Sequence, residues 1–99
     1  MIKEFFDNVQ RLFNDIVTDK TNAHTHTAEK LLAVLRCKVT QPIKIMEEAS
    51  CVCVVYYNVS VILPDNLSEM NIAYNSEYQM TFNEISSCDL HQLSEFILA

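Results

Sequence analysis

The spacing of hydrophobic and polar residues predicts a helix at the start of the chain. Apolar side chains recur there at i, i+3, i+4 and i+7, which places them on one face of a helix. These residues are Ile2, Phe5, Phe6, Val9, Leu12, Phe13, Ile16 and Val17. Because polar and acidic residues fill the other side, we expect a helix over residues 2–19 that packs against the core. The polar stretch 20–28 that follows predicts a linker.

The most hydrophobic part of the chain is residues 51–63, CVCVVYYNVSVIL, which are mainly β-branched, aromatic or thiol-bearing. This composition predicts a strand, and its two apolar faces place that strand in the middle of a sheet. Alternation before it predicts a long strand over residues 29–46, with a helix over 29–36 as the alternative. Because Pro42 cannot donate to a ladder, it predicts that the long strand lies at an edge or contains a bulge. Residues 47–50 are expected to form a loop.

Turn residues and a second alternating stretch follow the hydrophobic segment. Residues 64–69, PDNLSE, predict a loop. Residues 70–82 alternate between apolar and polar side chains, which predicts a half-buried antiparallel strand. A hairpin turn at Asn75-Ser76 is the alternative interpretation of this stretch.

The end of the chain predicts a second helix over residues 88–98, capped by Ser86 or Ser87. Leu90, Leu93, Phe96 and Ile97 form its apolar side. The complete pattern predicts an α+β fold, a three-stranded antiparallel meander with an N-terminal and a C-terminal helix (αβββα). Both helices are expected mainly on one face of the sheet, in a single domain over residues 1–99.

The predicted sheet leaves one face open. Pairing Val61 with Ile72 and Val59 with Tyr74 turns the odd-numbered residues of the middle strand towards the helices. The opposite face then carries an apolar ridge. That ridge consists of Val52, Val54 and Tyr56. Exposed apolar ridges usually bind a partner, so we expect a protein interface there; the alternative is that the first helix covers this face.

Size and composition exclude several classes of protein. Ninety-nine residues suffice for one modest core. The chain contains no glycine, which excludes a dinucleotide-binding fingerprint and a P-loop. It has neither a signal-peptide layout nor an apolar run long enough to span a membrane, so we expect a cytoplasmic protein, in the host cell if it is viral. The four cysteines are expected to pack as thiols, with a disulfide from Cys37 to Cys51 or Cys53 as an alternative.

Charge is distributed unevenly along the chain. Residues 1–44 contain all seven Lys and Arg and five acidic residues, a net charge of +2. Residues 45–99 contain eight acidic residues and no Lys or Arg, a net charge of −8. Such a surface repels nucleic acid, because phosphate contacts need clustered cations. Its natural complement is a basic protein surface.

Three groups of residues are of types used in metal binding or catalysis, but their sequence context favours structural roles. His24 and His26 lie two residues apart without an evident third metal ligand. Cys88 and His91 are spaced i, i+3 and are expected on the solvent side of the last helix, away from any cleft. Cys51 and Cys53 are expected in the core. We therefore expect no enzyme, no cofactor and no metal site.

These properties predict a small acidic protein that binds a basic protein surface and blocks or adapts it. A phage or viral inhibitor of a host nucleic-acid enzyme, of the anti-CRISPR or anti-restriction type, fits this description. The expected contacts are Glu47, Glu48, Asp65, Glu69 and Glu77, with Val52, Val54 and Tyr56 as the apolar part. One alternative is a self-assembling module that dimerises through its sheet; another is an immunity protein, an antitoxin or a secretion chaperone.

Overall fold

The computed structural model describes residues 2–17, 22–38, 44–48, 51–56, 58–75 and 77–98. Within these ranges the chain forms four α-helices, one short 3-10 helix and five strands, which confirms the α+β class. In chain order they are α1 (Ile2–Ile16), α2 (Ala23–Lys38), β1 (Lys44–Glu48), β2 (Cys51–Val55), β3 (Val59–Pro64), η1 (Leu67–Glu69), β4 (Asn71–Tyr74), β5 (Tyr78–Thr81), α3 (Phe82–Ser87) and α4 (Leu90–Leu98).

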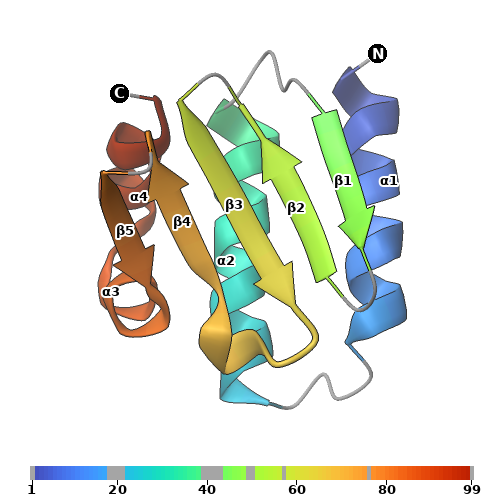
Figure 1. Cartoon of the computed structure of the whole chain (residues 1–99), viewed down its shortest axis with the longest axis horizontal. Coiled ribbons are helices and arrows are strands. Elements are labelled where there is room, and N and C mark those ends of the chain that lie inside the picture. Colours follow the sequence, from blue (N-terminus) through green and yellow to red (C-terminus); the bar gives the residue numbers. More distant parts are fainter. Residues whose placement is uncertain are drawn as a thin grey trace.

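The five strands form one antiparallel sheet in the order β1-β2-β3-β4-β5. Helices α1, α2 and α4 lie on one side of it, and the opposite face carries no described helix (Figure 1). The core lies between these two layers, with Phe13, Leu31 and Ile72 among its fully buried side chains. The meander and the position of the helices agree with the prediction, but the expected number of three strands is wrong.

The first added strand arises because residues 51–63 form a hairpin and not one strand. Strand β2 pairs with β3, and Val54 lies opposite Val61. The backbone N–H of Tyr56 donates to the carbonyl oxygen of Val59 at 2.7 Å and closes the turn. Asn58, a common turn residue, marks this position in an otherwise strand-like sequence.

This hairpin reverses the predicted faces of β2. Directly opposite residues of a hairpin share a face, so even-numbered residues of β2 lie with odd-numbered residues of β3. Val52 and Val54 are 1% and 0% exposed, and Tyr56 is also buried. The predicted exposed ridge of Val52, Val54 and Tyr56 is therefore wrong, because all three face the helices.

The predicted linker over 20–28 and long strand over 29–46 are wrong for residues 23–38, while residues 20–21 and 39–43 lie outside the described residues and residues 44–46 do belong to a strand. One helix, α2, covers Ala23–Lys38, so the alternative helix over 29–36 was right in type and too short. The Asn22 side chain accepts a hydrogen bond from the N–H of His24 at 2.7 Å, and its carbonyl oxygen accepts one from Thr25 at 3.1 Å. Asn22 therefore caps a helix whose sequence, AEKLLAVLR, is rich in helix-forming residues.

Strand β1 is shorter than predicted and extends into the expected loop. It covers Lys44–Glu48 and pairs with β2, with Met46 opposite Cys53. Glu47 and Glu48 therefore belong to a strand, while residues 49–50 of the expected loop lie outside the described residues. Pro42 lies outside them as well, but the predicted edge position holds for β1, which pairs with β2 alone among the described strands.

The predicted single strand over 70–82 is wrong: this stretch forms the β4–β5 hairpin, as the alternative interpretation of Asn75-Ser76 proposed, and Phe82 begins α3. Asn75 has a φ angle of 51°, in the left-handed region that asparagine tolerates better than most residues. The N–H of Glu77 donates to the carbonyl oxygen of Tyr74 at 3.0 Å. The predicted pairings of Val61 with Ile72 and of Val59 with Tyr74 are confirmed.

The predicted helix over 88–98 corresponds to α4, and a short helix that was not predicted, α3, precedes it; each of the two has its own cap. Thr81 and Glu84 form a capping box at the start of α3. At the start of α4, the N–H of Gln92 donates to the Asp89 carboxylate at 2.8 Å, and the Gln92 side chain accepts from the N–H of Asp89 at 2.9 Å. The predicted caps Ser86 and Ser87 are wrong. Their hydroxyl groups lie in the last turn of α3 and donate back to the carbonyl oxygen of Asn83.

Lys30 joins α2 to the C-terminal end of α3. Its ammonium group donates hydrogen bonds to the carbonyl oxygens of Ile85, Ser86 and Cys88, at 3.0, 3.2 and 2.7 Å. These carbonyl groups mark the negative end of α3, where a cation is favoured. Lys30 was predicted to lie on a strand, so this contact could not have been inferred from that assignment.

Replacing Tyr56 by Phe is expected to stabilise the protein. The Tyr56 hydroxyl is buried and has no hydrogen-bond partner among the described residues, so its removal should raise the free energy of unfolding by about 1 kcal/mol. Burial also raises the pKa of this hydroxyl far above its usual value. The folded protein therefore holds this proton more tightly than the unfolded chain does. This tighter binding of the proton stabilises the folded state of the wild type fully below pH ~10, and the stabilisation is lost as the pH rises further.

Urea titrations of wild type and Tyr56→Phe at neutral pH and above pH ~10 would test both effects. The difference between the two proteins should widen at alkaline pH. If Tyr56→Phe were less stable than wild type at neutral pH, the hydroxyl would make a favourable contact in solution and the prediction would be wrong.

Candidate protein-interaction surface

The predicted contact residues do not form a single site. Val52, Val54 and Tyr56 are buried, while Asp65, Glu69 and Glu77 are exposed. Asp65 lies just before η1 and Glu69 is its last residue, whereas Glu77 lies beyond the other end of β4. Glu47 and Glu48 occupy β1, and their side chains lie outside the described residues. The structure therefore separates the predicted acidic contacts into at least two groups.

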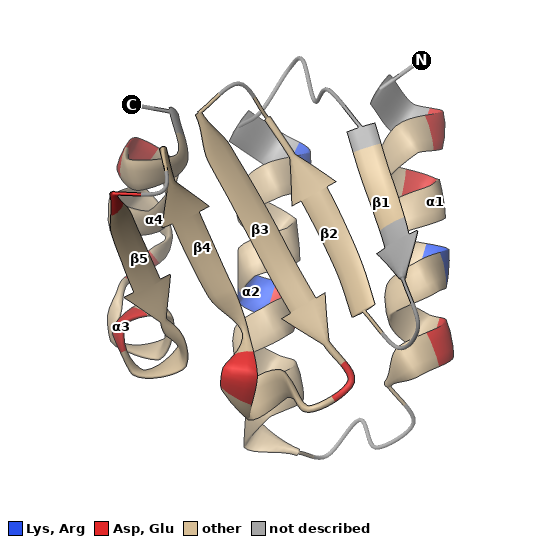
Figure 2. Cartoon of the chain, viewed as in Figure 1, with Lys and Arg blue, Asp and Glu red and all other residues tan. Residues whose placement is uncertain are grey.

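Among the residues whose side chains the structure describes, the basic residues lie on different elements from the acidic residues of the carboxyl-terminal half. The basic residues drawn in Figure 2 lie on the helices α1 and α2, while the described acidic residues of the carboxyl-terminal half surround the sheet and lie on α3 and α4. Arg11 contacts Asp15 at 3.5 Å and Arg36 contacts Asp7 at 3.8 Å, so both arginines pair with acids of α1. Among the described acids after residue 44, none forms an ion pair with Lys or Arg; Glu95 pairs with His91 at 2.9 Å.

An aromatic cluster that the sequence analysis did not single out lies at the β5 edge of the sheet. It consists of Tyr74, Tyr78 and Phe96. The ring centroids of Tyr78 and Phe96 are 5.5 Å apart, and those of Tyr74 and Phe96 are 6.0 Å apart. Tyr78 is 48% exposed, so part of this aromatic cluster is open to solvent. The alternation of residues 70–82 placed both tyrosines on one face, but their contact with Phe96 depends on where α4 packs.

Glu84 fixes the exposed ring of the aromatic cluster. The Tyr78 hydroxyl donates to the Glu84 carboxylate at 3.0 Å, and the N–H of Thr81 donates to the same group at 3.3 Å. Both bonds lower the pKa of Glu84, and the bond from Thr81 has the larger effect. The pKa of Tyr78 is raised, chiefly because its hydroxyl donates to a carboxylate. Glu84 is therefore both a helix cap and a support for Tyr78.

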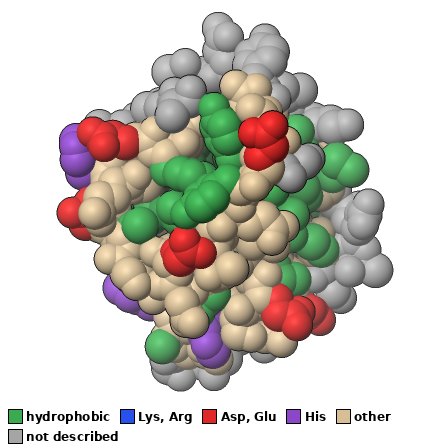
Figure 3. Space-filling view, turned by 60° about the vertical axis from the view of Figure 1, so that its left-hand side comes forward, with side chains coloured by type: hydrophobic (Ala, Val, Ile, Leu, Met, Phe, Trp, Pro, Cys, Tyr) green, Lys and Arg blue, Asp and Glu red, His purple; other side chains and the backbone are tan. Residues whose placement is uncertain are grey.

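The view towards the β5 edge shows how the two kinds of side chain are distributed. Hydrophobic side chains gather near the middle of this face, and acidic side chains surround them (Figure 3). Among the described residues in this view, no Lys or Arg side chain is visible. An apolar patch with a rim of one charge sign is typical of a protein interface.

The outer face of the sheet is a second apolar surface. Cys51, Cys53 and Val55 of β2 lie there, next to Ile62 of β3. These side chains are half-buried, although no described helix covers this face (Figure 1). The prediction that one apolar face of the sheet carries no helix therefore agrees with the described structure, but the residues predicted for that face lie on the opposite one. Cys51 and Cys53 were expected in the core, and their half-buried position on this outer face shows that this prediction is wrong. Cys37 belongs to α2, and its side chain lies outside the described residues.

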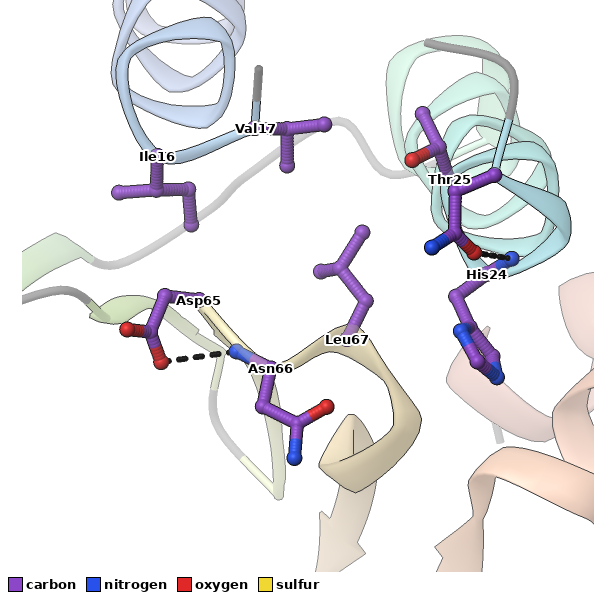
Figure 4. A pocket seen from close by; sticks show the side chains of 8 residues that line it. Ile16, Val17, His24, Thr25, Asp65, Asn66 and Leu67 are labelled. Atoms are coloured by element: carbon purple, nitrogen blue, oxygen red, sulfur yellow. Dashed lines mark hydrogen bonds between the residues drawn. The ribbon is translucent and has the colours of Figure 1, made fainter. Parts of the chain in front are cut away.

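A small cavity of about 170 Å³ lies between the end of α1, the start of α2 and η1. The titratable side chains among its described lining residues are Asp65 and His24, which lie on opposite sides of Leu67 (Figure 4). Asp65 accepts a hydrogen bond from the N–H of Asn66 at 2.8 Å. The His24 ring packs edge-on against Phe82, with the ring centroids 4.7 Å apart. Asp65 and His24 therefore do not converge on one point in the described part of the cavity.

The other residues considered for chemistry have structural contacts. His24 and His26 lie in the first turn of α2 and not in a linker. Cys88 packs partly against the core, contrary to its predicted solvent position, while the exposed His91 contacts Glu95. Among the described residues there is no group of three or more His, Cys, Asp or Glu that could hold a metal ion. No helix in the described ranges is both long and apolar enough to cross a membrane.

Comparisons of this chain with protein-family models, curated proteins and solved structures gave no match.

Proposed function

We propose that this protein acts by binding a basic surface of another protein, which it thereby blocks. The observation that carries this proposal is the set of exposed carboxylates after residue 44, none of which is paired with Lys or Arg among the described residues. Unpaired exposed carboxylates project a negative potential, which attracts a positive partner and accelerates encounter. The sheet and helices hold these charges on one folded body, so little order has to be gained on binding.

A nucleic-acid-binding protein is the partner class that this charge favours. Such proteins carry clustered Lys and Arg in a groove for phosphates. An acidic protein bound there excludes the nucleic acid both by charge and by bulk. With thirteen acidic residues in the whole chain, the charge density is too low for extended imitation of a duplex, so occlusion contributes at least as much as mimicry. We propose an inhibitor of a host nucleic-acid enzyme, of the anti-CRISPR or anti-restriction type, as the specific role.

The function is tested by capturing the partner and reversing selected charges. Partners captured from host lysate and identified by mass spectrometry should be basic, and adding the protein should displace their bound nucleic acid. The double variant Glu69→Lys and Glu77→Lys should bind the purified partner about tenfold more weakly at low salt, with a smaller salt dependence. Asp65 is left unchanged because it bonds the backbone of Asn66.

The matched control is the double variant Glu4→Lys and Glu29→Lys, which has the same net charge but changes exposed residues of α1 and α2. Its affinity should stay within about twofold of wild type if position decides binding, since a net-charge effect alone would weaken both variants equally. Equal affinities of all three proteins, or a partner that binds without regard to salt, would overturn the proposal.

Self-association through the outer sheet face is a second candidate, favoured by its apolar residues Cys53, Val55 and Ile62. A twofold dimer would cover these side chains on both copies. Light scattering of the wild type should then give twice the chain mass, and Val55→Asp should give the monomer mass. A monomeric wild type at about 100 μM would reject this candidate. An immunity protein, an antitoxin or a secretion chaperone would use the same acidic surface, and the captured partner distinguishes these roles.

A further inference from the structure

We infer that the aromatic cluster of Tyr74, Tyr78 and Phe96 anchors an arginine side chain of the basic partner. This inference rests on the proposed function and adds a position and a chemical specificity to it. The aromatic cluster is the part of the acidic face where exposed ring surface and carboxylates occur together. An arginine is the side chain that can use both at once, because its planar guanidinium stacks on rings and donates in pairs to carboxylates.

The geometry of Tyr78 prepares it for such a contact. The ring is held from one side by Phe96, at 5.5 Å between centroids, and at its hydroxyl by Glu84, at 3.0 Å. It is nevertheless 48% exposed. An immobilised ring with a free surface loses little side-chain entropy when a cation stacks within about 6 Å of its centre.

Among the neighbouring acids, Glu77 is the most suitable to accept hydrogen bonds from a guanidinium. It is exposed and comes directly before Tyr78 in the β4–β5 turn. Glu84 already accepts from Tyr78 and Thr81, and Glu95 pairs with His91. Glu84 bonds the aromatic cluster directly, while Glu77 and Glu95 come directly before Tyr78 and Phe96 in the chain. An arginine would have to displace the present contacts of Glu84 and Glu95, whereas Glu77 has no comparable side-chain contact among the described residues.

The position of β5 favours an extended partner segment. This strand is an edge of the sheet, and its residues Gln79 and Thr81 are exposed. An edge strand offers backbone hydrogen-bonding groups to a segment that lies alongside it. Alternate side chains of such a segment would point towards the same face as Tyr78.

The inference is tested with a nonapeptide of alternating arginine and serine, compared with its lysine and glutamate counterparts. Titration of the ¹⁵N-labelled protein followed by NMR should shift the amide signals of β5 and of the turn of α4 around Phe96. The arginine peptide should bind more tightly than the lysine peptide, and the glutamate peptide should not bind. Tyr78→Leu should weaken arginine-peptide binding about two- to fivefold, and Tyr78→Phe should weaken it less because the ring remains.

Control variants separate this inference from the proposed function. Glu77→Gln should weaken arginine-peptide binding, while Glu4→Gln, on α1, should not. Equal affinity for the two cationic peptides, an unchanged affinity of Tyr78→Leu, signals shifted elsewhere, or no binding would each overturn the arginine site. In these cases the double variant Glu69→Lys and Glu77→Lys still decides the proposed function. Weaker binding of this variant to the captured protein partner would support the proposed function, and unchanged binding would overturn it.

Discussion

Replacing Val54 by Asp should prevent the protein from folding. Val54 is 0% exposed and lies in β2 opposite Val61, on the face covered by the helices. A carboxylate there would be buried without a partner or would have to be protonated, at a cost of more than about 4 kcal/mol. Because a chain of this size has a total stability of only about 5–15 kcal/mol, most or all of it would be lost. Circular dichroism and the dispersion of NMR signals would show the unfolded state.

The neighbouring variant Val55→Asp is the matched control, since residue type and substitution are the same. Val55 lies on the outer face of the sheet and is half-buried, so this variant should fold with a loss of about 1–2 kcal/mol. If 51–63 were a single strand with odd-numbered residues facing the helices, the order would be reversed. A folded Val54→Asp protein beside an unfolded Val55→Asp protein would therefore exclude the hairpin register described above.

Replacing Lys30 by Met should destabilise the protein by about 2 kcal/mol. Methionine keeps most of the apolar stem but leaves the carbonyl oxygens of Ile85, Ser86 and Cys88 without their ammonium donor. Two of these three contacts are partly buried, so water replaces the donor incompletely. Urea unfolding would measure the change, and hydrogen exchange should show that the protection of α3 falls most.

Arg36→Met is the control for this prediction. Arg36 is also a basic residue of α2, but its contact with Asp7 is 3.8 Å long and joins two side chains that are about half exposed. Surface ion pairs of this kind contribute little, so the free energy of unfolding should change by less than about 0.5 kcal/mol. Similar losses in the two variants would indicate that general charge, and not the hydrogen bonds of Lys30, decides the effect.

Both hairpins were predicted as single strands, and the number of residues in each turn explains why the predicted faces are right for 70–82 and wrong for β2. The β4–β5 turn follows a pairing of Tyr74 with Tyr78, so residues of equal parity share a face and the simple alternation of 70–82 stays valid. The β2–β3 turn joins strands in which Val54 faces Val61, so parity changes across it. A continuous run of β-branched residues gives no sign of this change except Asn58, which is a weak signal beside so many strand-forming neighbours.

Helix α2 was missed for a different reason. Its hydrophobic residues surround much of the helix, because it packs beneath the sheet and beside other helices, so no clear amphipathic stripe distinguishes it. Residues such as Leu35 could therefore be assigned equally well to an alternating strand. Local propensity in AEKLLAVLR indicated a helix correctly, and the cap at Asn22 would have supported it.

The sign of the charge on the candidate surface could be predicted from the sequence, but the arrangement of its aromatic side chains could not. Counting acids and bases along the chain is enough to expect a negative carboxyl-terminal half, and the described structure places these acids around the sheet, α3 and α4. The aromatic cluster depends on the packing of Phe96 of α4 against Tyr78 of β5, which no local pattern specifies. Long-range contacts of this kind require the tertiary fold.

The confinement of lysine to the first 44 residues also determines how the molecule can be attached to a solid support. Every side-chain amine of the chain lies at or before Lys44, so coupling by amine chemistry leaves Glu69, Glu77 and the ring of Tyr78 unmodified. Beads or sensor chips prepared in this way hold the protein by its basic half and present its acidic half to the solution.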